Sequence, residues 1–439
     1  MYIHQELRTR AAAGEPVRVG LIGAGKFGSM FLSQVPTTPG LRVAAIADLK
    51  PDQARKTCKD IGWPDGLIAS VLFTDDAREM IATDGIDVIV EATGNPIVGI
   101  AHARAAIRAG RHIIMVNVEA DVLAGALLAE EARRAGVVYS MAYGDQPALT
   151  CELVEWARAT GFDVVAAGKG TKYLPAYHAS TPETVWEHYG LTQQQAEQAG
   201  MNPQMFNSFL DGTKSALEMA AIANATGLTP SPNGLMFPPA GMDDLAHVLR
   251  PKSEGGQLHH KGQVEVVSSV ERDGRPVFKD LRWGVYVVIE APNDYAAACF
   301  RQYGMNTDKS GRFSAMYKPF HLIGLELNIS ILSAALLGKP TGTTKSFEGD
   351  VVAIAKRDLK AGEFLDGEGG YTVWGKLYSA QESLAIGGLP IGLAHNIELK
   401  SDVRAGQPII WSAVIIDETI EAVKIRREME ARSITALQT

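Results

Sequence analysis

The sequence predicts an α/β protein with three parts: a doubly wound parallel sheet, an α+β domain with an open sheet, and a small all-β domain near the C-terminus. Apolar strands alternate with helices over the first third of the chain, which is typical of a parallel sheet. This alternation then stops, and short strands separated by turns follow in the last hundred residues. We therefore predict domains at 1–147, 148–340 and 345–425, with the last helix of the second packing back on the first.

The composition argues against several classes of protein. The 439 residues carry a net charge of −8, which disfavours nucleic acid or an anionic membrane as the main partner. The three cysteines form no C-x-x-C pair, so no disulfide framework is indicated. The longest apolar region, residues 320–338, contains Glu326 and Asn328 and reads as a buried helix rather than a membrane span. We expect a cytoplasmic homo-oligomer that acts on a small anionic molecule.

The first strand, residues 17–22, runs into a glycine-rich turn and a helix. Its G-x-G-x-x-G spacing allows a tight turn, close approach of a pyrophosphate and close packing of the helix. A second strand ends on the carboxylate of Asp48, 20 residues after Gly28, where the adenosine ribose of a dinucleotide would lie. We predict a Rossmann domain; the alternative is a glycine-rich turn in another α/β fold. The candidate cofactor residues are Gly23, Gly25, Lys26, Phe27, Gly28 and Asp48.

The choice between NAD and NADP stays open at this stage. Asp48 favours NAD, because its carboxylate would repel a 2′-phosphate. Lys50 lies two residues further along and would soften that repulsion.

Later strands also end on polar residues or glycine, and ligands of doubly wound sheets bind at the carboxyl ends of the strands. We assign Thr93, Gly94 and Asn117 to the cofactor and Tyr143 to the substrate. For Glu119 a catalytic and a structural role are equally favoured, and Asp121 is expected to cap or begin a helix. Each of these residues has the alternative interpretation of a helix cap or turn residue.

The middle of the chain concentrates charged residues in front of apolar segments. Lys214 and Glu218 are spaced i,i+4, and the almost wholly apolar or small residues around them indicate a cleft rather than a solvated ion pair. Lys318 and His321 precede the long apolar region and either reach an anionic substrate or mark the entry to a helix. Candidate catalytic residues here are Lys169, Lys172, Asp211 and Lys214, and candidate substrate residues are Asn207, Ser208, Lys318 and His321.

Residues up to about 330 resemble the homoserine dehydrogenase superfamily. The motifs that carry this resemblance are "GLIGAGKFGS", "DVIVEATGNP", "MVNVEADVLAG" and "GTKY" at 170–173. The last hundred residues resemble a SAF (β-clip) domain, on "VVAIAKRDLKAGE" and "LPIGLAHNIELKSDVRAGQPI". The combination is similar to the bacterial 1-deoxy-D-xylulose 5-phosphate reductoisomerase-like group, to which "NPQMFNSFLDGTKSA" and "YKPFHLIGLE" also point.

This resemblance implies rearrangement of a phosphorylated keto-sugar, then reduction by NADPH, in isoprenoid biosynthesis. It also implies a divalent ion, Mg or Mn, with Asp145 as the first candidate ligand and Glu119 as the second. Lys169, Lys172, Lys214 and Lys318 become candidates for proton transfer or phosphate binding. The sequence departs from these relatives at Val118, where they carry lysine in an "A-N-K" element.

Two other interpretations remain open from the sequence. One is a homoserine-dehydrogenase-like NAD(P) dehydrogenase that acts on another hydroxy acid, keto acid or sugar acid without isomerisation; Asp48 favours it. The other is a non-catalytic cofactor-binding sensor or scaffold, which the lysines of the middle domain disfavour.

Overall fold

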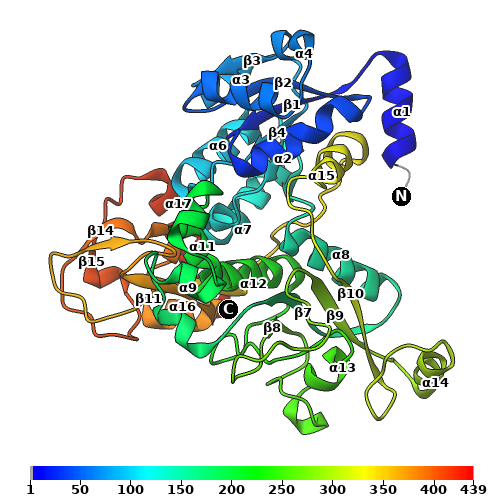
Figure 1. The fold of residues 1–439 in the computed structure, drawn as a ribbon, viewed down its shortest axis with the longest axis vertical. Coiled ribbons are helices and arrows are strands. Elements are labelled where there is room, and N and C mark those ends of the chain that lie inside the picture. Colours follow the sequence, from blue (N-terminus) through cyan, green and yellow to red (C-terminus); the bar gives the residue numbers. More distant parts are fainter. Residues whose placement is uncertain (1–2, 439) are drawn as a thin grey trace. The chain divides into compact units, whose positions relative to one another are not determined.

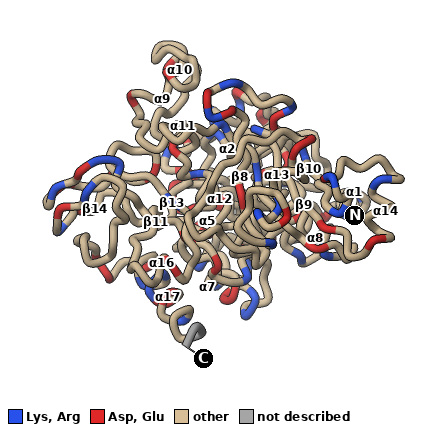
Figure 2. The backbone as a smooth tube through the Cα atoms, turned by 90° about the horizontal axis from the view of Figure 1, so that it is seen from below, with Lys and Arg blue, Asp and Glu red and all other residues tan. Residues whose placement is uncertain are grey.

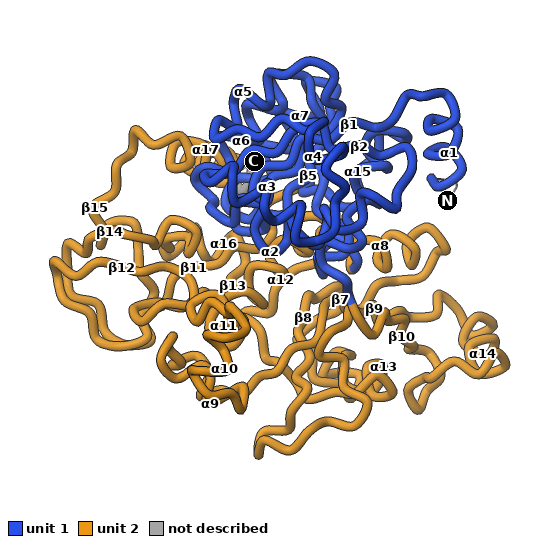
Figure 3. The backbone as a smooth tube through the Cα atoms, turned by 45° about the horizontal axis from the view of Figure 1, so that its top comes forward, with its two compact units in different colours: residues 1–149, 321–345 blue, residues 150–320, 346–439 orange. Residues whose placement is uncertain are grey.

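The computed structural model describes residues 3–438 and forms two compact units. Residues 1–149 and 321–345 make up the first unit, and residues 150–320 and 346–439 make up the second (Figure 3). The chain thus leaves the first unit within α8 (Gln146–Ala159) and returns to it after β10 (Phe313–Lys318). The three domain boundaries expected from the sequence stay predictions.

The first unit is built on a six-stranded parallel sheet (Figure 1). Its order, β3-β2-β1-β4-β5-β6, is that of a doubly wound dinucleotide-binding sheet, and this confirms the predicted fold class. Val-, Ile- and Leu-rich strands fit it because both faces of such a sheet are covered. The strands are β1 (Val17–Ile22), β2 (Leu41–Ala47), β3 (Leu72–Thr74), β4 (Val88–Glu91), β5 (His112–Met115) and β6 (Tyr139–Met141).

Helices follow these strands, and α6 packs against α7 while α2 packs against α3. The segment 321–345 joins this unit because its Leu327 and Ile331 share one apolar core with the strands and with Ile3 of the first helix. The helices are α1 (Ile3–Ala13), α2 (Lys26–Gln34), α3 (Pro51–Asp60), α4 (Asp65–Ala69), α5 (Ala77–Ala82), α6 (Pro96–Arg108), α7 (Val118–Ala135) and α15 (Asn328–Leu332).

The second unit contains a four-stranded mixed sheet of order β10-β9-β7-β8. Two of its strand pairs are antiparallel, whereas β7 (Asp163–Thr171) and β8 (Gln263–Ser268) are parallel. The long connection between them, which holds several helices, makes the parallel pairing possible. The remaining elements are β9 (Val285–Glu290), α9 (Val185–Tyr189), α10 (Gln193–Gln198), α11 (Pro203–Leu210), α12 (Thr213–Thr226), α13 (Leu245–Val248) and α14 (Asp294–Gln302).

Helix α12 is buried at every position except Lys214, because it packs against the mixed sheet and against two strands from the C-terminal segment. Small side chains permit this close packing. A Cβ atom at Gly349 would lie 3.2 Å from the Cα atom of Ala220 and 3.3 Å from the Cβ atom of Ala223. The C-terminal segment is therefore part of the core around α12.

The C-terminal segment forms small antiparallel sheets, as predicted, and two helices that the sequence prediction left out. One sheet pairs β11 (Gly349–Ala355) with β13 (Val373–Ser379), and the other contains β12 (Phe364–Asp366), β14 (His395–Leu399) and β15 (Val414–Ile415). The helices are α16 (Ala380–Ile386) and α17 (Glu421–Gln438). Acidic and basic residues are interspersed near β14 (Figure 2). In the same segment the Nζ of Lys360 lies 2.7 Å from Asp402 Oδ2.

No helix among residues 3–438 has the length and apolar character needed to cross a bilayer. The apolar region at 320–338 contains only the short α15 and a π-helical turn at Ser333–Leu337.

Candidate functional site

The glycine turn after β1 has the geometry that its spacing predicts. Gly23 has φ +92°, and a Cβ atom there would lie 2.7 Å from the carbonyl oxygen of Ala92. A Cβ atom at Gly28 would lie 2.4 Å from the carbonyl oxygen of Gly23, so only glycine lets the helix pack this closely. At Gly25, by contrast, no heavy atom lies within 4 Å of the added Cβ. This is the position where a pyrophosphate would approach the N-terminus of α2.

Asp48 holds this turn in place while remaining partly exposed at the end of β2. Its Oδ2 accepts a hydrogen bond from the backbone N–H of Ala24 at 2.9 Å, and its Oδ1 accepts from the N–H of Lys50 at 2.9 Å. Each carboxylate oxygen can accept more than one hydrogen bond. The side chain therefore keeps acceptor capacity for ribose hydroxyls. Lys26 is exposed and Phe27 partly buried in the first turn of α2.

The loop after β4 places Thr93 and Gly94 at the exposed edge of the sheet, and its anchor is Glu91. The Thr93 hydroxyl donates to Glu91 Oε1 at 2.5 Å, and His102 Nδ1 lies 3.4 Å from the same oxygen. Glu91 itself is fully buried. This carboxylate, which the sequence analysis did not single out, fixes the loop that carries two predicted cofactor residues.

Asn117 is the N-cap of α7, a role that we predicted for Asp121 as one of two alternatives. Its Oδ1 accepts from the N–H of Ala120 at 3.0 Å, and its Nδ2 donates to the carbonyl of Asn95 at 2.9 Å. The helix begins at Val118, three residues after β5 ends at Met115. Asn117 is 1% exposed, so its buried contacts favour a positioning role over direct contact with a cofactor.

Glu119 and Asp121 both lie in the first turn of α7 and are buried. Asp121 accepts hydrogen bonds from the hydroxyls of Tyr139 at 2.8 Å and Thr344 at 2.9 Å. Burial raises the pKa of Asp121 to about 6, and these two hydrogen bonds oppose the rise. Asp121 is thus a buried structural carboxylate, whereas the role of Glu119 stays a prediction.

The divalent-metal site expected around Asp145 gains no support. The Oδ1 of Asp145 accepts the N–H of Gln146 at 2.9 Å, at the start of α8. Among the described residues, no three His, Cys, Asp or Glu side chains gather to hold a metal ion. The neighbouring Tyr143 is partly buried, and its backbone N–H donates to Ser330 at 2.7 Å. Its contact with substrate stays a prediction.

In the second unit, Lys169 of β7 forms a buried ion pair with Glu218 of α12. Lys169 is 6% exposed and Glu218 is 3% exposed. From the i,i+4 spacing of Lys214 and Glu218 we predicted a cleft rather than a solvated ion pair. The structure shows Glu218 bound to a lysine from the sheet, because α12 lies directly on β7. A buried ammonium held by one carboxylate is a suitable proton donor or carbonyl-polarising group.

Lys172 directly follows β7 and is partly buried. Its Nζ donates to the carbonyl of His188 at 2.5 Å. Burial and, secondly, the charge of Arg282 lower the pKa of Lys172. Arg282 was not among the residues predicted from the sequence, and no motif around it would have indicated its position.

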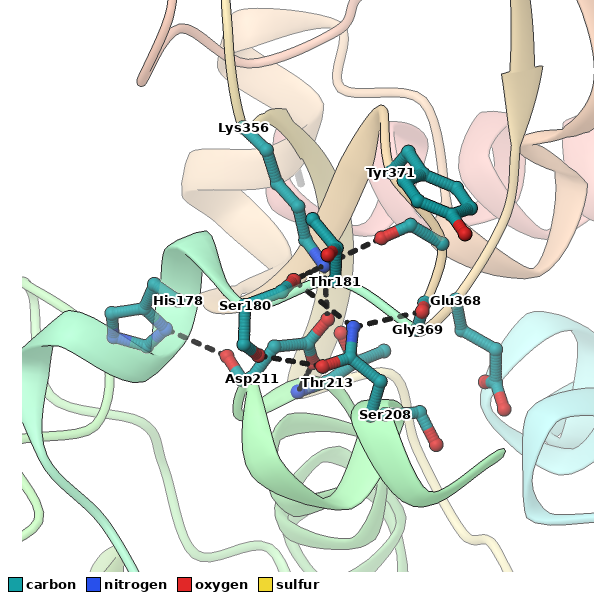
Figure 4. Close-up of polar contacts among 12 residues, drawn as sticks. His178, Ser180, Thr181, Ser208, Asp211, Thr213, Lys356, Glu368, Gly369 and Tyr371 are labelled. Atoms are coloured by element: carbon teal, nitrogen blue, oxygen red, sulfur yellow. Dashed lines mark hydrogen bonds and ion pairs between the residues drawn. The ribbon is translucent and has the colours of Figure 1, made fainter. Parts of the chain in front are cut away.

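Asp211 was predicted to be catalytic, but its surroundings favour a structural role (Figure 4). It is fully buried and lies 2.8 Å from the Nζ of Lys356, which comes from the C-terminal segment. The same ammonium donates to the carbonyls of Ser180 at 2.7 Å and Gly370 at 2.8 Å. One lysine therefore neutralises Asp211 and joins three segments of the second unit.

Asn207 and Ser208, predicted to bind substrate, take part in the same junction. The amide of Asn207 donates to the carbonyls of Ser180 at 3.0 Å and Gly369 at 2.8 Å, and Ser208 Oγ donates to the carbonyl of Met205 at 2.8 Å. Both side chains are buried. Their polar groups are used within the fold, which favours structure over substrate binding.

His178 completes the junction. Its Nδ1 lies 2.7 Å from the carbonyl oxygen of Asp211, and its Nε2 lies 2.9 Å from the hydroxyl of Tyr173. Burial lowers the pKa of His178, so the neutral ring donates through Nδ1 to the carbonyl and accepts at Nε2 from Tyr173. The ring also stacks on Trp374 of β13 at 3.9 Å.

The structure leaves the predicted roles of three further residues open. Lys214 is the partly exposed residue of α12, and Lys318 ends β10 with its Nζ 5.7 Å from the ring centroid of Phe320. His321 begins the segment that returns to the first unit. All three stay predictions.

Two family models match this chain side by side. Residues 17–143 match the oxidoreductase family with an NAD-binding Rossmann fold (GFO/IDH/MocA). Residues 144–327 match the catalytic domain of oxidoreductase DRL. The first domain is therefore an NAD-binding Rossmann domain of the oxidoreductase type. Neither match extends beyond residue 327 or concerns homoserine dehydrogenases, so the SAF-like and homoserine dehydrogenase resemblances stay predictions.

Three known proteins illustrate which part of the chain has relatives. The 4-hydroxy-tetrahydrodipicolinate reductase of Cupriavidus necator is 28% identical over 152 residues, which are 34% of this chain and 56% of that protein. Biliverdin reductase from Synechocystis sp. PCC 6803, solved with biliverdin and NADP+, is 19% identical over 36% of this chain and 48% of its own, with a TM-score of 0.27. Scyllo-inositol dehydrogenase from Lactobacillus casei, solved with NAD(H) and scyllo-inositol, is 15% identical over 39% and 50%, with a TM-score of 0.28. The chain thus spans about half the length of each.

Proposed function

We propose that this protein is an NAD(P)H-dependent oxidoreductase of the 1-deoxy-D-xylulose 5-phosphate reductoisomerase-like group. It would rearrange 1-deoxyxylulose 5-phosphate to an aldehyde and reduce that aldehyde to 2-C-methyl-D-erythritol 4-phosphate, a step of isoprenoid biosynthesis. The observation that carries this proposal is the match of residues 144–327 to the DRL catalytic domain. The NAD-binding domain that precedes it supplies the hydride donor.

The reduction adds a hydride from the nicotinamide to the aldehyde carbon and a proton to its oxygen. We assign the proton to Lys169, because this buried ammonium is held by Glu218 at the middle of the mixed sheet. The bound dinucleotide would place its pyrophosphate at Gly25 and its adenosine ribose at Asp48. Because Asp145 and Glu119 are not part of a metal-binding group among the described residues, no step is assigned to a metal.

A second candidate is an NAD-dependent dehydrogenase of another hydroxy acid, keto acid or sugar acid. The partly exposed carboxylate of Asp48 favours it, since that charge disfavours the 2′-phosphate of NADPH. A non-catalytic sensor, the third candidate, has no need of the buried pair Lys169–Glu218.

Absorbance of reduced nicotinamide at its long-wavelength maximum separates these candidates. The full chain is incubated with NADPH or NADH and 1-deoxyxylulose 5-phosphate, with Mg²⁺ or Mn²⁺ and in parallel with a chelator. The proposal expects at least one of the two cofactors to be oxidised. The rate of oxidation should fall by a factor of about 10² or more in Lys169→Met, which is the size of effect typical of general-acid catalysis. The matched control is Lys261→Met, which removes an exposed lysine of the same unit that pairs with Glu254 and Glu290.

No oxidation of either cofactor would overturn the reductoisomerase proposal. Turnover of a hydroxy acid or sugar acid instead would establish the second candidate, and cofactor binding without any turnover would establish the third. Equal activity of Lys169→Met and Lys261→Met would remove Lys169 from the chemistry.

A further inference from the structure

We propose that Lys172 and Arg282, which both approach the ring of Tyr189, form a binding site for a phosphate monoester. This inference rests on the proposed function, because it assigns the phosphate group of that substrate to a place in the second unit. Lys172 follows β7, Arg282 precedes β9, and Tyr189 ends α9. The site therefore gathers three elements that are far apart in the sequence.

The backbone brings the two cations together through Gly170. A Cβ atom at this position would lie 1.9 Å from the carbonyl oxygen of Leu281 and 2.9 Å from the backbone nitrogen of Arg282. The N–H of Gly170 also donates to the carbonyl of Gly284 at 3.1 Å. Residues 281–284 thus lie directly on the end of β7, where any larger residue than glycine would push them away.

The two cationic groups approach the same aromatic ring. The Nζ of Lys172 lies 6.0 Å from the ring centroid of Tyr189, and the guanidinium carbon of Arg282 lies 5.9 Å from it. Arg282 also lies 4.7 Å from the ring centroid of Trp283. Both cations are partly buried, so their charges are less screened than those of surface lysines.

Neither cation has a carboxylate partner among the described residues, unlike other lysines of the second unit. Lys169 and Lys279 each form an ion pair, with Glu218 and with Asp243. For Arg282 the adjoining carboxylate, Asp280, accepts the backbone N–H at 2.8 Å. Two neighbouring positive charges that are partly desolvated repel each other, and an anion between them would remove that repulsion. The lowered pKa of Lys172 reflects the same surroundings.

The donors that remain suit phosphate better than a carboxylate. Lys172 uses one N–H for the carbonyl of His188, which leaves two of its three donors. The guanidinium of Arg282 makes no hydrogen bond within residues 3–438 and offers a planar pair of donors. A phosphate monoester has three terminal oxygens and close to two negative charges at neutral pH, which match two cations.

Isothermal titration of the full chain with glycerol 3-phosphate, and separately with glycerate, tests this site. We expect wild-type protein to bind the phosphate at least tenfold more tightly than the carboxylate. Arg282→Gln and Lys172→Gln should each weaken phosphate binding by about tenfold or more, as expected for the loss of a charge-assisted hydrogen bond. Lys172→Arg should retain it, and the matched control Lys279→Gln, on the same loop, should leave it unchanged.

Equal binding of glycerate and glycerol 3-phosphate would overturn the phosphate assignment in favour of a carboxylate site. Phosphate binding that is absent, or unchanged in both glutamine variants, would overturn the site itself. Comparison of Lys172→Arg with Lys172→Gln serves as the control for misfolding, because both variants change the same position and only the second removes the charge. If phosphate binding depends on both cations but 1-deoxyxylulose 5-phosphate is not turned over, the site stands and the proposed reaction fails. If 1-deoxyxylulose 5-phosphate is turned over and Arg282→Gln has the KM of the wild type, the proposed reaction stands and the phosphate site fails.

Discussion

Asp48 and Asp211 both looked functional in the sequence, yet the structure places them in opposite environments. Asp48 is partly exposed at a strand end, and its oxygens accept hydrogen bonds from the backbone N–H groups of Ala24 and Lys50 only. Asp211 is fully buried and is paired with Lys356. The first carboxylate keeps acceptor capacity for a ligand, whereas the second is used within the fold.

The two carboxylates differ in where their hydrogen-bonding partners lie in the sequence. The partners of Asp48 belong to the predicted motif itself: Ala24 lies in the glycine turn, 24 residues earlier, and Lys50 lies two residues after Asp48. The partner of Asp211 comes from the C-terminal segment, which also contributes the Gly370 carbonyl and Trp374 to the same junction. The C-terminal segment therefore stabilises the middle of the chain rather than forming a separate attachment to it.

The largest effect that tests this comparison is expected for Lys356→Met. The substitution leaves the carboxylate of Asp211 buried without its counter-charge, which should lower the free energy of unfolding by about 3–5 kcal/mol. Urea unfolding followed by circular dichroism measures it. The matched control, Lys360→Met, breaks the exposed pair with Asp402 and should change stability little.

The double variant Lys356→Met/Asp211→Asn removes the uncompensated charge and should recover a large part of that loss. A double variant as unstable as Lys356→Met alone would show that the lysine acts through its contacts with the Ser180 and Gly370 carbonyls instead.

A second test uses Asp121, a buried carboxylate of the first unit. Its pKa is raised from 3.8 to about 6, so between these values the folded protein holds a proton that the unfolded chain has lost. The stability that Asp121 contributes should therefore be fully present below pH 4 and be lost as pH rises through 6, by about 2–3 kcal/mol. Asp121→Asn does not titrate. Its stability relative to wild type should rise by that amount between pH 4 and pH 7 in urea unfolding experiments.

Asp84→Asn, an exposed substitution in the same unit, is the control and should keep the wild-type slope. Parallel pH profiles for wild type and Asp121→Asn would mean that Asp121 is not responsible for the pH dependence.

The sequence predicted the first unit better than the second, for a physical reason. The glycine turn, the parallel sheet and Asp48 follow from local spacing, because alternating strands and helices and the glycine motif are patterns within short stretches of sequence. The pairing of Asp211 with Lys356, and the approach of Arg282 to Lys172, depend on long-range packing that no local pattern encodes. Helix α16 is an intermediate case: Ser379 and Glu382 form a capping box and Gly387 ends the helix, so a local signal was present.

The smallest expected effect concerns Asp48 itself. Asp48→Ser removes the charge at the ribose site but keeps a short polar side chain, so NADH affinity should fall by about tenfold, the loss of one charge-assisted hydrogen bond. NADPH affinity should stay equal or improve, because the 2′-phosphate no longer meets a carboxylate. Fluorescence titration with each nucleotide measures both, and Asp52→Ser, an exposed substitution at the start of α3, is the control. If the affinities for NADH and NADPH fall equally, Asp48 acts by holding the turn at Ala24. Asp48 would then be a structural residue like Asp211, only less buried.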